Sequence, residues 1–400
     1  MEIKNYKKTL ITCYIGFITQ AIVANFTPLL FLRFHAEFDI PIAKIALIST
    51  VFYIVQILVD VFCAKFVDRI GYRKCVVASQ ITSAAGLILL AFLPSLLPSR
   101  LLGILISVVI YAVGSGLIEV LVSPIVEACP FENKDSVMSL LHSFYCWGSV
   151  GVIVLSSLFF TVFGIGSWRV LACLWALLPL YNIFNFASCP IERLTEEGKG
   201  MTIFQLFKTP LFWVAVLLMV CAGASELAMA QWASAYTEAA LGFSKAVGDL
   251  LGPCLFAVTM GISRMIYGKY GETIPLHKYM LVSGALCLGC YLLASLAADP
   301  VFSLIGCIFC GFSVGIMWPG TISIISPRLP QGGTALFAML AMAGDLGGAF
   351  GPSLVGTVCQ LNSNDLHSGM LAGSVFPLVL IVALAALSLQ SKKTGSLPQG

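Results

Sequence analysis

The sequence predicts an all-α membrane protein with twelve transmembrane helices in two pseudo-symmetric six-helix bundles. Hydrophobic residues make up 59% of the 400 positions and charged residues only 10%, with a mean hydropathy of +0.97. A soluble chain with a solvated surface does not reach these values. Long apolar runs also alternate with short charged turns, and a bilayer core of about 30 Å needs roughly 20 apolar residues per helix.

Twelve apolar runs are long enough to span a bilayer. The predicted spans cover residues 9–33, 41–66, 75–97, 101–127, 135–163, 167–189, 210–238, 244–270, 278–298, 301–326, 333–359 and 369–390. The first run follows Lys4, Lys7 and Lys8 and has no small-residue cleavage site, so we expect an uncleaved first span.

The basic residues predict the orientation of the chain. One set of turns holds the three N-terminal lysines, Arg69, Arg73 and most of the other Lys and Arg residues, whereas the opposite side receives few. The residues expected on the outer side are Arg33, Lys44, Arg100, Arg169 and Lys245. The positive-inside rule therefore places both termini in the cytoplasm of a multi-pass plasma-membrane protein, which we expect in the bacterial inner membrane.

The longest polar stretch divides the chain into two halves. We expect an N-terminal bundle over residues 1–189, a cytoplasmic linker with a short amphipathic helix over 190–209, and a C-terminal bundle over 210–400. An offset of 204 positions superimposes the turn after the second span of each half, which indicates an internal repeat. The superimposed pairs are Asp60 with Arg264, Ala64 with Gly268, and Asp68 with Glu272.

Residues 64–74 resemble the Gly-x-x-x-Asp-Arg-x-Gly-Arg-Arg signature of the major facilitator superfamily. The matching residues are Asp68, Arg69, Gly71, Arg73 and Lys74, with Ala64 in place of the first glycine. This resemblance implies the six-plus-six transporter fold and says little about the substrate.

Two further stretches resemble fucose-permease-like proton symporters. Residues 114–124 are similar to that family's Gly-x-Gly-x-x-Glu-x-x-x-Asn-Pro stretch, with Ser123 in place of Asn, and residues 142–148 to its His-x-Phe-Phe-x-x-Gly stretch. The resemblance implies that Glu119 belongs to the proton and sugar site. The fucose permease has a second acid in the first span, where this chain offers only Gln20, Asn25 and Thr27.

Acids inside membrane spans are functional candidates by default, because burying a charge in the bilayer is costly. Glu119 and His142 lie at similar depth on neighbouring predicted helices and can form a proton-sharing pair. The alternative is a structural role, with His142 bonded to a backbone carbonyl and Glu119 paired elsewhere.

Three more acids lie in the second half. Glu226 is a candidate for proton coupling, and Asp345 is either a proton site or a structural partner of Arg264. Asp249 lies near Lys245, which favours an ion pair at the outer rim.

Several polar and aromatic side chains suit a sugar, which needs hydrogen-bonding groups and an apolar face for stacking. The candidate substrate-binding residues are Gln20, Asn25, Trp147, Gln231 and Trp232. The alternative for either tryptophan is ordinary helix packing.

A charge network is predicted on the cytoplasmic side, where it would hold the two halves together when the cavity opens outward. Its members are Asp60, Asp68, Arg69, Gly71, Arg73, Arg264 and Glu272. The alternative is that these charges only solvate the turns.

Together these features predict a secondary active transporter that moves a neutral polar small molecule, a sugar or sugar derivative, by proton symport with alternating access. The alternative is a proton-driven efflux antiporter of cationic or amphiphilic compounds. A sensor or scaffold on a transporter fold is a weaker alternative.

The chain shows no signature of an enzyme or a metal site, so neither a cofactor nor a metal is expected. The CxxC of Cys307 and Cys310 lies in an apolar helix, which favours packing. With a net charge of +3, we expect no nucleic acid partner. The expected partners are the solute, the proton and the lipid bilayer, and we expect a monomer.

Overall fold

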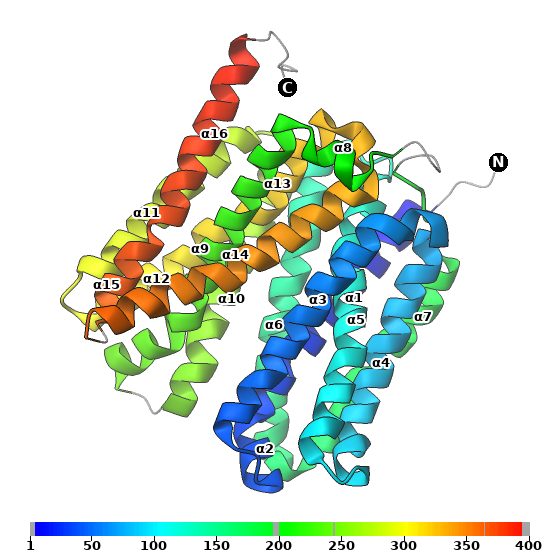
Figure 1. Ribbon diagram of the computed structural model, residues 1–400, viewed down its shortest axis with the longest axis vertical. Coiled ribbons are helices and arrows are strands. Elements are labelled where there is room, and N and C mark those ends of the chain that lie inside the picture. The colour runs from blue at the N-terminus through cyan, green and yellow to red at the C-terminus, as the bar shows by residue number, and fades with distance from the viewer. Residues whose placement is uncertain (1–4, 195–199, 243–244, 364, 394–400) are drawn as a thin grey trace. The chain divides into compact units, whose positions relative to one another are not determined.

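The structure is a computed structural model that describes residues 5–194, 200–242, 245–363 and 365–393. All regular elements among these residues are helices (Figure 1). Eleven helical segments are long and apolar enough to cross a membrane, and α10 (Lys245–Tyr270) occupies the remaining predicted span. The predicted all-α membrane fold is therefore confirmed.

The first half of the chain contains six predicted spans. Its elements are α1 (Tyr6–Asn25), η1 (Thr27–Leu30), α2 (Phe31–Phe38), α3 (Ile42–Ile70), α4 (Tyr72–Leu96), α5 (Arg100–Glu127), α6 (Lys134–Phe163), η2 (Ile165–Ser167) and α7 (Trp168–Ser188). The short α8 (Ile203–Phe207) follows, within the stretch predicted to hold an amphipathic helix.

The second half supplies the other six. Its elements are α9 (Pro210–Leu241), α10, α11 (Leu276–Leu296), α12 (Pro300–Val314), α13 (Met317–Ile325), η3 (Ser326–Arg328), η4 (Pro330–Gly332), α14 (Gly333–Leu361), α15 (Leu366–Gly373) and α16 (Val375–Lys393).

Three predicted spans are interrupted, including the twelfth at Ser374 between α15 and α16. The first changes from α1 through η1 to α2, where Pro28 stands at the start of the 3-10 turn and lacks the N–H of a regular helix. The tenth is divided into α12 and α13 at Gly315 and Ile316. Single-sequence hydropathy does not detect such interruptions, because the apolar run continues through them.

The chain forms two compact units that do not follow the midpoint of the sequence. Unit 1 contains residues 1–131, 144–203 and 331–339, and unit 2 contains residues 132–143, 204–330 and 340–400. The first residues of α6 thus belong to unit 2, and the first residues of α14 belong to unit 1.

Small residues bring the helices of unit 1 together. α4 packs along α5 and α7, and α5 also packs on α1 and α3. A Cβ on Gly86 or Gly114 would collide with the facing helix, so glycine is needed for the close approach of α4 and α5. Buried aromatic and aliphatic side chains such as Phe26, Tyr111 and Trp168 fill the spaces between these helices.

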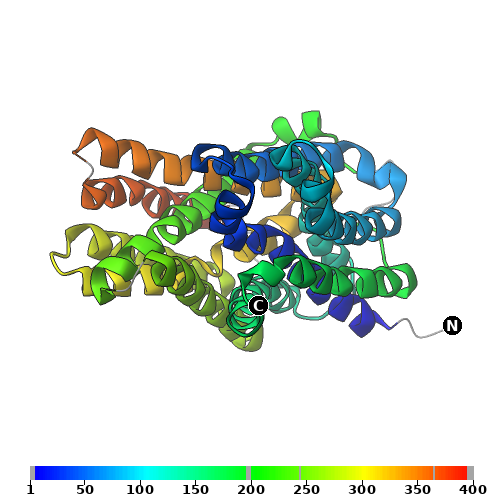
Figure 2. The same cartoon turned by 90° about the horizontal axis from the view of Figure 1, so that it is seen from below.

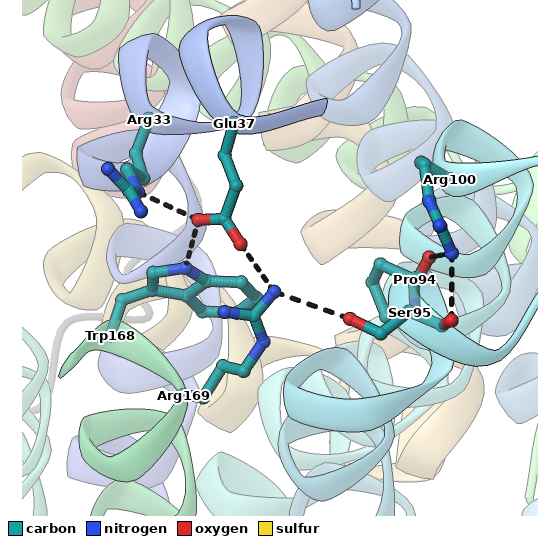
Figure 3. A network of polar contacts seen from close by, with 7 residues as sticks. All are labelled: Arg33, Glu37, Pro94, Ser95, Arg100, Trp168 and Arg169. Atoms are coloured by element: carbon teal, nitrogen blue, oxygen red, sulfur yellow. Dashed lines mark hydrogen bonds and ion pairs between the residues drawn. The ribbon is translucent and has the colours of Figure 1, made fainter. Parts of the chain in front are cut away.

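A polar network joins the ends of three helices in unit 1, as Figure 3 shows. Glu37 of α2 accepts hydrogen bonds from Arg33 Nε (2.7 Å) and from Trp168 Nε1 (3.0 Å), and it pairs with Arg169. Arg169 also bonds Ser95 at the end of α4 (3.3 Å). The network therefore pins the short α2 to α7 and α4, and it explains where two of the predicted outer-side arginines lie.

In unit 2, α9 contacts α10, α12 and α16, and α11 lies beside α12 and α16. The α11–α12 hairpin is visible in yellow in Figure 2. Glycines again mark the closest approaches, because a Cβ on Gly347 or Gly351 of α14 would collide with the backbone of α9.

Candidate functional site

The Gly114–Gly116 stretch of α5 positions Glu119. Gly114 faces α4, whereas Gly116 faces α3, where a Cβ would lie 3.0 Å from the side chain of Val59. Glu119 follows Gly116 by three residues and therefore shares its helix face. Because Gly116 has no side chain, α3 lies close enough for its Gln56 side chain to reach the Glu119 carboxylate.

Two carboxamides hold that carboxylate. Gln20 of α1 donates from Nε2 to Glu119 Oε2 at 2.9 Å, and Gln56 of α3 donates to the same oxygen. Both glutamines are almost fully buried, whereas Glu119 is partly exposed. We call Gln20, Gln56 and Glu119 the carboxamide cluster. The structure thus brings together the predicted residues Gln20 and Glu119.

Gln56 was missed by the sequence analysis. It is an isolated carboxamide in an apolar span, and no local pattern distinguishes it from a packing residue. Its Oε1 atom is buried and has no hydrogen-bond partner among the described residues. Since a buried acceptor of this kind is costly unless it is satisfied, Gln56 offers a position for a ligand donor.

Asn25 and Trp147 lie on α1 and α6, which approach closely in unit 1. A Cβ on Gly148 would collide with Ala21 of α1. Asn25 Nδ2 donates to Ser149 Oγ of α6 (3.1 Å) and to its own helix at Ala21 (2.9 Å). Trp147, two residues before Ser149 in α6, is partly buried. The two predicted substrate-binding residues therefore come from one helix pair.

Glu226 of α9 lies beside a buried arginine of α10 in unit 2. Arg264 Nη2 is 3.8 Å from Glu226 Oε2, and Arg264 is 3% exposed. Arg264 also donates from Nε to the Gly315 carbonyl (2.7 Å) and from Nη1 to the His142 carbonyl (3.0 Å). The described ion pair of Arg264 is therefore with Glu226, whereas the sequence analysis considered Asp345 as its structural partner.

His142 and Glu119 belong to different units, so their pairing stays a prediction. The His142 side chain is buried, and its backbone carbonyl accepts from Arg264. The geometry thus gives His142 a structural contact through its backbone and leaves its imidazole as a candidate proton carrier.

Asp345 lies in the glycine-rich part of α14. Gly344 leaves room for the indole ring of Trp318, and Gly347 leaves room for the α9 backbone. The Asp345 side chain is partly exposed, but its Oδ2 atom is buried and has no hydrogen-bond partner among the described residues. Asp345 can therefore accept a proton or a cationic group.

Two of the predicted substrate-binding residues, Gln231 and Trp232, lie in the second half of α9. Gln231 is exposed. The side chain of Trp232 lies outside the described residues, as does that of Asp249 on α10. Their proposed roles stay predictions.

The signature turn is held by side-chain hydrogen bonds within unit 1. Thr334 at the start of α14 donates to Asp68 Oδ1 (2.6 Å), and its hydroxyl also bonds the Tyr72 hydroxyl (2.5 Å). Gly71 joins α3 to α4 with φ +95, a conformation that favours glycine. Asp68 and Gly71 thus fix the turn, and their role in a cytoplasmic gate stays a prediction.

The other predicted gate residues lie in different surroundings. Arg73 donates to the carbonyls of Phe186, Ala187 and Cys189 at 2.7–2.9 Å, and so closes the C-terminal end of α7. Arg69 and Glu272 are exposed. Asp60 is completely buried in α3, and Arg264 has the contacts in unit 2 given above.

The described part of the chain holds no group of three His, Cys, Asp or Glu residues arranged to bind a metal. Cys307 and Cys310 are both buried in α12, and Cys310 Sγ lies 3.8 Å from Cys287 Sγ of α11. Cys307 Sγ instead lies 3.9 Å from the Met229 carbonyl of α9, so both thiols take part in helix packing, as the apolar surroundings of the CxxC predict.

Comparisons of structure find proteins with the same fold. The Escherichia coli fucose:proton symporter FucP has a TM-score of 0.78 at 16% identity, covering 96% of this chain and 99% of that one. The proton:xylose symporter XylE has a TM-score of 0.80 at 14% identity, covering 96% and 95%. The human organic anion transporter MFSD10 has a TM-score of 0.74 at 15% identity, covering 95% and 99%.

Comparisons of sequence give the family. No curated protein matches the chain significantly. The profile of the Major Facilitator Superfamily, however, matches residues 12–352, which is most of the chain. Together with the apolar spans and the signature turn, this match shows a multi-pass membrane transporter, and the chain belongs to the Major Facilitator Superfamily.

Proposed function

We propose that this transporter is a proton-coupled symporter of a neutral polar solute, a sugar or sugar derivative. It acts as a monomer in the bacterial inner membrane with both termini in the cytoplasm. The observation that carries the proposal is the carboxamide cluster, in which Gln20 and Gln56 both donate to one oxygen of Glu119.

The cluster links a proton to hydrogen-bonding groups that suit a sugar. An ionised Glu119 only accepts hydrogen bonds, whereas a protonated Glu119 also carries an O–H donor. Proton uptake therefore changes which partners Gln20 and Gln56 can bond. A sugar hydroxyl both donates and accepts, so it can bond the carboxamides that the carboxylate no longer holds and can donate to Gln56 Oε1.

This arrangement supports symport because the coupling between two sites is reciprocal. If protonated Glu119 favours solute binding, bound solute favours the proton to the same degree. Loading from outside and release inside then follow from alternating exposure of one midplane site. FucP and XylE, which share the fold, are described as proton symporters of fucose and xylose, and this agrees with the proposed class.

The test is uptake into proteoliposomes. Purified protein would be reconstituted and assayed with a panel of radiolabelled neutral sugars, including fucose and xylose, with and without an inward proton gradient. We expect at least one sugar to accumulate only with the gradient. Glu119→Gln should abolish accumulation while leaving solute exchange, and Glu132→Gln, at an exposed position after α5, is the matched control. Accumulation by Glu119→Gln at the wild-type rate would refute the assignment of the proton site.

Export of cationic compounds is the second candidate, and Asp345 favours it. Its buried Oδ2 atom has no partner among the described residues and can accept a cationic group. A lipophilic cation that binds the purified protein, loses affinity in Asp345→Asn and is unaffected by sugars would favour export. Retention of cation affinity by Asp345→Asn would remove the support for this candidate.

A further inference from the structure

A proline inside the tenth span leaves one backbone carbonyl without its helical partner. In a regular helix the Gly315 carbonyl would accept from the N–H of residue 319, but that residue is Pro319, which has none. The span is interrupted at this point, between the end of α12 and the start of α13. In a membrane span such a carbonyl must find another donor.

Arg264 of α10 supplies that donor. Its Nε atom is 2.7 Å from the Gly315 carbonyl oxygen. A Cβ on Gly315 would lie 2.9 Å from both the Met260 carbonyl oxygen and the Ser263 Cβ, so glycine is what permits α10 to approach this carbonyl. The guanidinium thus replaces the hydrogen bond that the proline removes.

The same guanidinium is held on two other sides. Its Nη1 atom donates to the His142 carbonyl of α6 at 3.0 Å, and its Nη2 atom lies 3.8 Å from Glu226 Oε2 of α9. The Arg264 backbone carbonyl also accepts from Ser139 of α6 (2.8 Å). One buried side chain therefore connects α6, α9, α10 and the α12–α13 interruption within unit 2.

A buried guanidinium stays charged, so its position depends on a counter-charge. The Glu226 side chain is 17% exposed and that of Arg264 only 4%, so the acid is the more accessible partner of the pair. Glu226 of α9 faces the guanidinium, and His142 of α6, which is also ionisable, contacts it through its backbone carbonyl. A change in the charge of Glu226 therefore acts directly on the group that satisfies Gly315.

We propose that Arg264 is a positioning residue that couples the charge of Glu226 to the α12–α13 interruption. While Glu226 is ionised, the ion pair holds the guanidinium on the Gly315 carbonyl and keeps the segment between α12 and α13 in place. When Glu226 is discharged by a proton, the guanidinium loses this counter-charge and its bond to Gly315 weakens, so the segment between α12 and α13 becomes free to rearrange. This inference rests on the proposed symport. It makes the tenth span the element of unit 2 that moves when Glu226 takes up a proton.

The first test needs no substrate. Hydrogen exchange would be measured over residues 312–322 of the purified protein. Arg264→Gln should speed exchange there by about tenfold or more, because the Gly315 carbonyl loses its donor. Glu226→Gln should speed it to a smaller degree, because it removes only the counter-charge. Arg169→Gln, which breaks an ion pair with Glu37 in unit 1, is the matched control and should leave residues 312–322 unchanged.

A double variant separates a coupling role from a merely structural one. Glu226→Gln with Arg264→Gln removes both charges and should recover the part of the thermal stability that either single variant loses by leaving one charge unpaired. Exchange over residues 312–322 should nevertheless stay fast in the double variant, because Gly315 still lacks its donor. Arg264→Lys, which keeps the charge without the forked geometry, should preserve the pairing with Glu226 and protect Gly315 only in part.

Transport completes the test in the proteoliposomes described above. Glu226→Gln should lose gradient-driven accumulation and retain solute exchange. Wild-type protection of residues 312–322 in Arg264→Gln, or unchanged accumulation in Glu226→Gln, would overturn the inference. If the wild-type protein accumulates no neutral sugar, the proposed substrate fails, whereas the exchange measurement still decides the role of Arg264.

Discussion

The α3–α4 turn of unit 1 and the α10–α11 turn of unit 2 are related by the 204-residue repeat, yet different interactions hold them. In unit 1 the contacts are polar, because Asp68 and Tyr72 both bond the Thr334 hydroxyl at the start of α14. In unit 2 close helix packing is added to longer hydrogen bonds, because a Cβ on Gly268 would lie 3.0 Å from Leu140 Cβ of α6, and the Tyr267 hydroxyl donates to the Ile274 carbonyl at 3.4 Å. The α10–α11 turn, which matches the signature only weakly, is therefore held in a different way from the α3–α4 turn.

The comparison extends to the residue after each turn. Arg73 bonds the last carbonyls of α7, which is the sixth predicted span. Its counterpart at the same offset, His277, bonds Ser388 of α16, the twelfth predicted span. Both residues tie the start of a third span to the end of the last span of their half. The repeat thus preserves a contact while the residue type changes from Arg to His.

The largest expected effect tests the close packing in unit 2. Gly268→Leu should destabilise the protein by about 1–3 kcal/mol, because the new side chain has no room beside Leu140. Ala64→Leu, the counterpart in unit 1, should cost less than about 0.5 kcal/mol, since Ala64 is partly exposed. Thermal unfolding in detergent would measure both. Equal losses would show that the two turns are packed alike.

The second prediction concerns backbone conformation, which distinguishes the first turn. Gly71→Ala should cost about 1–3 kcal/mol, because Gly71 has φ +95 and a Cβ is strained there. Gly289→Ala, in α11 after the second turn, meets nothing within 4 Å and should be neutral or stabilising. Thermal unfolding of the two variants would test this, and a harmless Gly71→Ala would mean that the turn relaxes to another conformation.

Hydropathy predicts the spans of this chain well, because each helix must bury an apolar run, but the interactions between helices depend on distant residues. Gln56 could not be assigned to Glu119 from a single sequence, since the two lie 63 positions apart and no pattern connects them. The Gly315 carbonyl is different. Pro319 predicts that it lacks a partner, although only the structure identifies Arg264 as the donor.

The signature itself shows the same limit. Its resemblance identified the turn, and Gly71 and Asp68 lie where a turn residue and a helix-end acceptor are useful. The role of Arg73 at the end of α7 was not predicted, because a carbonyl acceptor more than 100 positions away leaves no sequence signal. Resemblance therefore locates a motif more reliably than it explains each of its residues.

The third prediction compares two acids at matching positions. Asp68→Ala should cost about 1–2 kcal/mol, because the Thr334 hydroxyl loses a charged acceptor at 2.6 Å. Glu272→Ala should change stability by less than about 0.5 kcal/mol, since Glu272 is exposed. Asp68→Asn keeps an acceptor and should fall between the two. Equal effects of Asp68→Ala and Glu272→Ala in thermal unfolding would break the contrast between the turns.

The smallest expected effect lies at the residue after each turn. Arg73→Ala should cost about 0.5–1 kcal/mol, because Arg73 is largely exposed and its bonds to the α7 carbonyls compete with water. Hydrogen exchange at the amides next to those carbonyls should rise in Arg73→Ala, whereas Lys74→Ala, an exposed neighbour with no helix end to close, should leave it unchanged. His277→Ala should raise exchange near Ser388 of α16 and leave α7 unaffected. Each variant would then loosen only the last helix of its own half, and an effect of His277→Ala on α7 would contradict the independence of the two ties.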